Sequence, residues 1–165
     1  MQLKETKEAL NKFGKYVVQQ ARSNLTKRKM NVSKDLYDSL KYRVKKVGNN
    51  LILTISMDEY GKFQDRGVSG TKKKYDTPYK YTTKMPPPKA FSQWVVRKGL
   101  EGTRDKKTGR FLSRKSLQYA VAKNIFKFGI KPSMFFTKPF EKGFKNLPEE
   151  LQEAFIIDID NLIFE

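Results

Sequence analysis

The sequence predicts an α+β protein, in which helices at both ends flank a small antiparallel β-sheet with a long basic hairpin or arm. Three observations support this fold class. Apolar residues recur at helical spacing near both ends, two alternating runs surround a Gly-Asn-Asn connection, and the middle of the chain is irregular and basic. The length of 165 residues fits one domain, residues 1–165.

The N-terminal part predicts an amphipathic helix over residues 5–25. Its apolar residues follow one another at three- and four-residue steps, with basic and amide side chains between them. These apolar residues are Leu10, Phe13, Val17, Ala21 and Leu25. We expect a polar basic loop over residues 26–31, followed by a short helical turn that places Leu36 and Leu40 on one side.

A β-hairpin is predicted next. Tyr42 and Val44 alternate with basic residues, and apolar residues occupy every second position from Leu51 to Met57. The residues Gly48-Asn49-Asn50 lie between the two runs. Because Gly and Asn tolerate positive φ, this sequence predicts a three-residue connection between antiparallel strands.

The middle of the chain carries two irregular basic stretches. Residues 72–84 alternate aromatic with basic or hydroxyl residues. This pattern predicts a protruding basic arm at about 66–85, whose deletion over 70–83 leaves the fold intact. Consecutive prolines end this arm, and either Pro87 or Pro88 can occupy the first turn of a helix that contains Trp94. The second basic stretch spans residues 102–115.

Three helices are predicted for the C-terminal part. Apolar residues at helical spacing indicate a helix over residues 116–128, which Gly129 can cap at its C-terminus. A second helix is expected at 137–146. The last, at about 148–163, begins near Pro148 with glutamates in its first turns, which complements the helix dipole.

The last helix is apolar on more than one side, which has two interpretations. Its apolar residues could contact a neighbouring subunit, or they could pack under the N-terminal helix. The residues assigned to a subunit interface are Phe155, Ile156, Ile159, Leu162 and Ile163 of this helix, together with Tyr75, Tyr79 and Tyr81 of the arm.

The net charge of +18 arises from 35 basic and 17 acidic residues and is unevenly distributed. Residues 1–57 contribute +9 and residues 58–116 contribute +10, whereas residues 148–165 contain six acids and no base. This asymmetry favours one surface for a polyanion and another for a protein, with a merely solvated surface as the alternative.

The composition excludes several classes of site. The sequence contains neither Cys nor His, which excludes disulfides, Cys/His zinc sites and catalytic Ser-His or Cys-His pairs. Asp58, Glu59 and Asp65 are candidate Mg²⁺ ligands of a nuclease, but a solvated turn explains them adequately. Many classes of enzyme are therefore excluded, and we expect no cofactor. Without an apolar run of about 20 residues or a signal peptide, we expect a protein of the cytoplasmic side with no membrane partner.

The two basic stretches predict contact with DNA. Lys and Arg neutralise phosphates without reading sequence, and Tyr rings add stacking where a base is exposed, so binding should be nonspecific and salt-dependent. The candidate DNA-facing residues are Lys72, Lys73, Lys74, Lys80, Lys84, Arg104, Lys106, Lys107, Arg110, Arg114 and Lys115.

Five short segments form a recognisable series by their order and spacing. They are Ser33–Leu40 (SKDLYDSL), Tyr60–Gly67 (YGKFQDRG), Lys84–Pro87 (KMPP), Trp94–Gly99 (WVVRKG) and Ala122–Phe136 (AKNIFKFGIKPSMFF). In this series, over roughly residues 8–147, the chain resembles the tail-completion or neck proteins of tailed double-stranded-DNA phages, the broad family of the minor tail protein Z of phage lambda. It departs from the family pattern at Asp65-Arg66, where a Glu usually precedes the glycine.

The resemblance implies a non-enzymatic virion protein that forms a ring, a hexamer or a dodecamer, in the neck or tail. Its implied partners are copies of itself, portal, head-completion or connector proteins, tail tube or terminator proteins, and viral double-stranded DNA. The residues that the family motifs imply to be structural are Leu36, Tyr60, Phe63, Gly67, Pro86, Trp94, Gly129, Pro132, Phe135 and Phe136. The alternative is a nonspecific nucleic-acid-binding protein, associated with ribosomes or the nucleoid.

Overall fold

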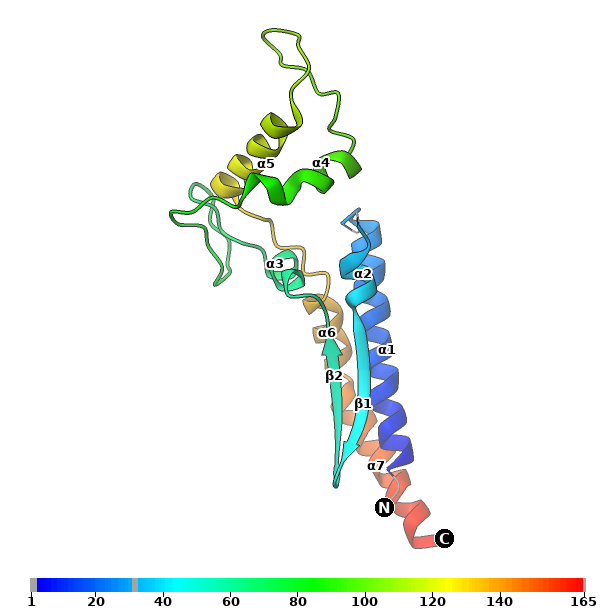
Figure 1. Cartoon of the computed structure of the whole chain (residues 1–165). Helices are drawn as coiled ribbons and strands as arrows, with labels where there is room; N and C mark the ends of the chain where they lie inside the picture. Colours follow the sequence, from blue (N-terminus) through cyan, green and yellow to red (C-terminus); the bar gives the residue numbers. More distant parts are fainter. Residues whose placement is uncertain (1–2, 31–32, 165) are drawn as a thin grey trace. The chain divides into compact units, whose positions relative to one another are not determined.

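The structure, a computed structural model, describes residues 3–30 and 33–164, except for the side chains of residues 163 and 164. The chain divides into two compact units, which are described separately. Unit 1 comprises Met1–Met30, Asp35–Asp58 and Met134–Glu165, and unit 2 comprises Asn31–Lys34 and Glu59–Ser133. Helices at both ends and a two-stranded antiparallel sheet confirm the predicted α+β class (Figure 1). The single domain inferred from the length stays a prediction.

Unit 1 is built on the long N-terminal helix. Helix α1 (Lys4–Lys27) confirms the first predicted helix and continues through Thr26 and Lys27, where we had expected the loop to begin. Its apolar face is buried from Phe13 to Leu25, as the sequence periodicity indicates. The short helix α2 (Asp35–Ser39) follows, with Leu36 buried.

The C-terminal helices run antiparallel to α1. These are α6 (Thr137–Phe144) and α7 (Leu147–Phe164), close to the predicted bounds. Asp158, late in α7, contacts Thr6 at the start of α1, whereas Leu147, at the start of α7, packs with Val17. Residues early in one helix thus meet residues late in the other, which establishes the antiparallel direction.

The β-hairpin covers another side of α1. Strands β1 (Lys41–Val47) and β2 (Asn50–Ser56) pair in antiparallel register. Because Val47 pairs with Asn50, the connection is a two-residue turn, Gly48-Asn49, and the three-residue connection predicted from the sequence is wrong by one residue.

The core of unit 1 lies between the hairpin and the helices. Its buried residues are Phe13, Val17, Val18, Ala21, Leu25, Leu36, Leu40, Phe135 and Leu147. Half-buried Tyr42, Leu53 and Ile55 of the hairpin pack against these residues, while the alternate strand positions are exposed. The hairpin therefore has one face on the core and one face in solvent.

The described part of unit 2 contains short helical segments and one longer helix. They are α3 (Tyr60–Arg66), the 3₁₀ turn η1 (Pro88–Phe91), α4 (Ser92–Arg97) and α5 (Arg114–Phe128). Pro88 begins the turn that leads into α4, as expected for a proline in the first turn. Helix α5 starts two residues before the predicted position because Ser113 caps it by accepting a hydrogen bond from the Ser116 N–H (3.1 Å).

The segment from 66 to 85 differs from the predicted hairpin or protruding arm. It forms an irregular loop, and its described residues include one isolated parallel bridge, between Ser69 and Lys80, but no antiparallel ladder. The first part of the loop is fixed to the C-terminal end of α5, because the Thr71 N–H donates to the Phe126 carbonyl (2.9 Å) and the Lys72 N–H to the Lys127 carbonyl (2.8 Å). These carbonyls lack partners within the helix, which explains why the loop binds there.

Candidate nucleic-acid and subunit interfaces

The segments Tyr60–Gly67 and Gly129–Phe136 of the motif series meet in space. Val68, next to the first segment, exchanges two backbone hydrogen bonds with Ile130 (2.9 and 2.8 Å). Gly67 and Gly129 both have positive φ (75° and 71°), a region in which a residue with Cβ is strained. A Cβ on Gly67 would lie 2.6 Å from the Ile130 carbonyl oxygen, and one on Gly129 would overlap the Val68 carbonyl.

Ser133, in the segment Gly129–Phe136, binds the C-terminal end of helix α3. The Ser133 N–H donates to the carbonyl of Asp65 (3.0 Å), and its hydroxyl donates to the carbonyl of Gln64 (2.6 Å). Both carbonyls belong to the last turn of α3, where intrahelical donors are missing. We call this arrangement, made by residues 64–70 and 127–133, the glycine junction.

The basic loop, residues 71–84, is organised around Ser69. The Ser69 N–H donates to the Tyr79 carbonyl (2.8 Å), and the Ser69 carbonyl accepts from the Tyr81 N–H (2.9 Å). The Ser69 hydroxyl accepts from the Tyr75 N–H (2.9 Å) and lies 3.2 Å from the Tyr75 carbonyl. Ser69 is 4 % exposed, so a buried residue of the glycine junction fixes the course of the loop.

The tyrosines of the basic loop pack within unit 2. The rings of Tyr79 and Phe63 meet edge to face at 4.8 Å, and Tyr81 approaches Phe126 in the same manner at 6.2 Å. Burial raises the pKa of the Tyr81 phenol above its ordinary value. Tyr75, Tyr79 and Tyr81 are all half-buried, so their rings contribute to the packing of the loop within unit 2.

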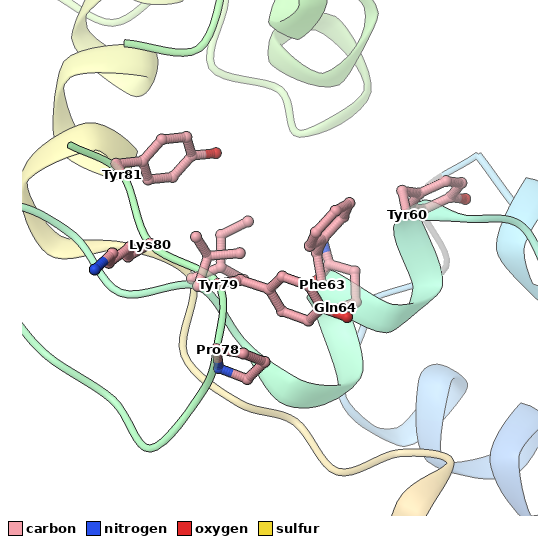
Figure 2. Close-up of a pocket in the computed structure, with 9 residues that line it drawn as sticks. Tyr60, Phe63, Gln64, Pro78, Tyr79, Lys80 and Tyr81 are labelled. Atoms are coloured by element: carbon pink, nitrogen blue, oxygen red, sulfur yellow. The ribbon is translucent and has the colours of Figure 1, made fainter. Parts of the chain in front are cut away.

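A cavity of about 490 Å³ opens beside these rings. Figure 2 shows Phe63 and Tyr79 close together, with Tyr60 and Tyr81 on either side and the Lys80 ammonium directed away from the rings. The remaining lining residues are Gln64, Val68, Pro78 and Ile130. The cavity is mainly aromatic and suits an apolar side chain better than a phosphate.

The lysines of the basic loop are exposed. Lys72, Lys74, Lys80 and Lys84 form no ion pair with any described residue, and the Lys73 ammonium lies 5.4 Å from the centre of the Tyr75 ring. Lys72 and Lys73 also lie beside the C-terminal end of α5, where the helix dipole favours positive charge. Part of this charge therefore stabilises the fold.

The second basic stretch forms a compact turn that we call the tip loop, residues 103–112. Arg104 and Phe111 form an antiparallel bridge, and the Asp105 carboxylate accepts hydrogen bonds from the N–H groups of Lys107 (3.0 Å) and Thr108 (2.8 Å). Hydrogen bonds from Thr108 and Lys107 hold the pKa of Asp105 below its ordinary value. Residues 103–112 therefore form a hairpin-like turn, although the sequence predicted an irregular stretch over 102–115.

The tip loop displays its cations to solvent. Lys106, Lys107 and Arg110 are exposed, and the Arg104 guanidinium lies 4.3 Å from the centre of the Phe111 ring, which is 65 % exposed. Beyond the loop, Lys115 is also exposed, whereas Arg114 forms an ion pair with Glu101 (3.7 Å) and donates to the Ser92 carbonyl (3.3 Å). Arg114 therefore has a structural role that the sequence did not indicate.

Helix α7 exposes apolar residues on more than one side. Phe155, Ile156 and Leu162 are 43 %, 51 % and 57 % exposed, and Ile159 is half-buried. The side chain of Ile163 lies outside the described residues. The alternative that Ile156 and Ile157 pack under the N-terminal helix is wrong, because they are 51 % and 49 % exposed and α7 contacts α1 through Leu147 and Asp158.

Comparison of the chain with known protein families, with curated proteins and with solved structures gave no match. In the described part of the chain, no helix is long and apolar enough to cross a membrane. Over the same residues, no three Asp, Glu, His or Cys side chains gather as metal ligands would.

The other motif residues lie in the two units as follows. Leu36 and Phe135 are buried in the core of unit 1, and Phe136 packs against it. In unit 2, Pro132 lies within 3 Å of a Cβ built on Gly67, Pro86 is half-buried, and Trp94 is 40 % exposed. Trp94 is thus a surface residue rather than a core residue.

Sequence reasoning missed Asp158, a carboxylate that is 4 % exposed in unit 1. It accepts hydrogen bonds from the N–H groups of Glu5 and Thr6 (both 2.9 Å) and from the Thr6 hydroxyl (2.7 Å). Burial raises the pKa of Asp158, but these hydrogen bonds together outweigh burial and hold its pKa below the ordinary value. The spacing of Asp158 could have indicated its burial, because it continues the row of buried Leu147, half-buried Leu151 and buried Ala154 along α7.

Proposed function

We propose that the chain is a structural virion protein of a tailed phage. In this proposal it forms a ring in the neck or tail region that joins the DNA-filled head to the tail, with its basic loops near the DNA channel. The ring contains copies of this chain and contacts portal, head-completion or connector proteins on one side and tail tube or terminator proteins on the other. It assembles in the host cytoplasm, becomes part of the virion and catalyses no reaction.

The observation that carries the proposal is the glycine junction. Gly67 and Gly129, separated by 62 positions, come from two different motifs of the phage-neck pattern. A side chain on either glycine would collide with the backbone of the segment that contains the other one. Close packing against the other motif therefore fixes the backbone at each glycine, and two motifs of the series form one structural element. The junction therefore supports the resemblance on which the function rests.

The displayed cations support the position of DNA in this proposal. The tip loop and the basic loop present lysine and arginine to solvent with few acids beside them, which offsets the repulsion of phosphates held in a channel. The same exposed cations favour the second candidate, a nonspecific nucleic-acid-binding protein. The two candidates differ in assembly, because only the first requires a closed ring.

Electron micrographs of the purified full chain, with and without DNA of arbitrary sequence, test the proposal. We expect closed rings of one diameter, with DNA binding that is weak and falls as salt rises. Monomers that coat DNA without forming rings would contradict the proposal and favour the second candidate.

A further inference from the structure

The outer face of the hairpin carries a row of cations. Lys41, Arg43 and Lys45 occupy alternate positions of β1, so their side chains share the face turned away from α1. All three are exposed, and none forms an ion pair or hydrogen bond with a side chain in the described part of the chain. Their cross-strand neighbours on β2 are the uncharged residues Ser56, Thr54 and Ile52. Successive cations of this row lie about 7 Å apart along one strand and repel one another, so an anionic partner would relieve this repulsion.

The outer side of α7 carries the opposite charge. Glu149, Glu153 and Asp160 follow one another at steps of four and seven residues, which places them in one row along the helix, with Ile156 in the same row. The three acids are exposed and form no ion pair with a described residue. Ile157, beside the row, is 49 % exposed.

The two faces match in length and in composition. The acidic row covers eleven residue steps of helix, which is about 16 Å. The basic row covers four residue steps of strand, which is about 13 Å. Each face also has an exposed apolar part, Ile156 and Ile157 on α7, and Val47 and Ile52 on the hairpin, which are 57 % and 47 % exposed.

The two faces cannot meet within one chain. The hairpin packs on α1 through Tyr42 and Leu53, and α7 packs on α1 through Ala154 and Asp158. Both outer faces are therefore turned away from the helix that they share. The chain thus has one basic face and one acidic face, neither of which has a partner within the chain. The acidic face of one copy can pair with the basic face of another.

We propose that the acidic outer face of α7 in one copy docks on the basic outer face of the hairpin in the next copy. This inference rests on the proposed function and deepens it, because it names the two surfaces that join ring subunits. The contact is heterologous, because each copy offers a donor face and an acceptor face. Such a contact closes a ring when the rotations from copy to copy add up to a full turn, and the proposed function requires that closed form. Attraction between the faces weakens as salt screens it.

The absence of cysteine from the sequence allows a direct test by cross-linking. The full chain is prepared as two single variants, Thr54→Cys on the hairpin face and Ile156→Cys on the α7 face, which are mixed and treated with a short bifunctional maleimide. We expect a heterodimer as the main cross-linked product. Gln20→Cys, an exposed position on α1, is the control in place of Thr54→Cys. Equal yields with Thr54→Cys and Gln20→Cys would overturn the inference.

Charge reversal tests the same contact without cross-linking. Arg43→Glu and Glu153→Lys should each lower self-association at least tenfold, and the combined variant should recover most of it. Circular dichroism verifies that each variant is folded. If rings form but neither single reversal weakens them, this inference fails while the proposed function stands. If the unaltered chain forms no ring in electron micrographs but the cross-link still forms at the named pair, the proposed function fails and the docking contact stands.

Discussion

Asp158 shows how one buried carboxylate can stabilise the start of a helix from a distant part of the chain. Helix α1 has no side-chain cap of its own, since Leu3 occupies the N-cap position. Asp158 supplies the missing acceptor to the N–H groups of Glu5 and Thr6. Because these donors have no partner inside the helix, the carboxylate both caps the helix and joins α7 to α1.

We expect Asp158→Ala to lower the free energy of unfolding by about 1–2 kcal/mol at neutral pH, since it removes a cap. Glu141→Ala removes an exposed acid from helix α6 and should change the free energy of unfolding by less than about 0.5 kcal/mol. The pKa of Asp158 is lowered in the folded protein, so its contribution is complete above about pH 4 and is lost as the pH falls through the folded value. Urea unfolding at several pH values measures both effects. If the difference in free energy of unfolding between the unaltered chain and Asp158→Ala stayed the same at acid pH, Asp158 would not have this role.

The glycine junction leads to a second prediction at the residue scale. Gly129→Ala should destabilise unit 2 by more than about 2 kcal/mol, because positive φ and overlap with the Val68 carbonyl act together. Gly109→Ala is the matched control, since Gly109 has nearly the same φ (68°) but open space around it. Thermal unfolding monitored by circular dichroism compares the variants. Similar losses for both would show that backbone strain alone accounts for the effect.

At the scale of elements, the two basic stretches differ in how firmly they are attached. The basic loop is fixed by hydrogen bonds to the end of α5 and to Ser69, whereas the tip loop is closed on itself by the hydrogen bond from the Leu112 N–H to the Thr103 carbonyl (2.9 Å). The first loop is therefore part of the fold of unit 2, and the second is an appendage.

Two deletions distinguish these roles. Removal of residues 70–83 should unfold unit 2, contrary to the sequence-based expectation, because α5 loses the donors from Thr71 and Lys72. Replacement of residues 104–111 by two glycines should leave the melting temperature almost unchanged, since Thr103 and Leu112 already lie together. Hydrogen exchange of the α5 amides measures how each deletion affects unit 2. If these amides stayed protected after deletion of residues 70–83, the basic loop would not be part of the fold of unit 2.

The helices and the hairpin could be predicted from the sequence because their apolar residues repeat with helical or strand periodicity. The course of residues 66–85 could not, since hydrogen bonds from Ser69 and from the backbone to the end of α5 determine it, and neither leaves a periodic signal. The tip loop was missed for a similar reason, because a single aspartate organises it. The basic row on β1 was visible in the sequence only as the polar half of an alternating strand.

At the scale of the whole molecule, charge is separated between surfaces. Lysine and arginine dominate the two loops of unit 2 and the outer face of the hairpin, whereas six acids lie in the last 18 residues. A net charge of +18 opposes self-association through long-range repulsion, so assembly needs a local contact between opposite charges or a polyanion that neutralises the excess. A ring around DNA would supply both.

The proposed ring can be tested by the mass of the full chain in solution. Native mass spectrometry over a range of protein concentrations, without nucleic acid and from about 50 mM to about 500 mM salt, separates the two candidates. We expect monomers and one discrete closed species of six or twelve copies, whose population falls as salt rises. Monomers at every concentration and salt, from a protein that still binds DNA tightly, would contradict it.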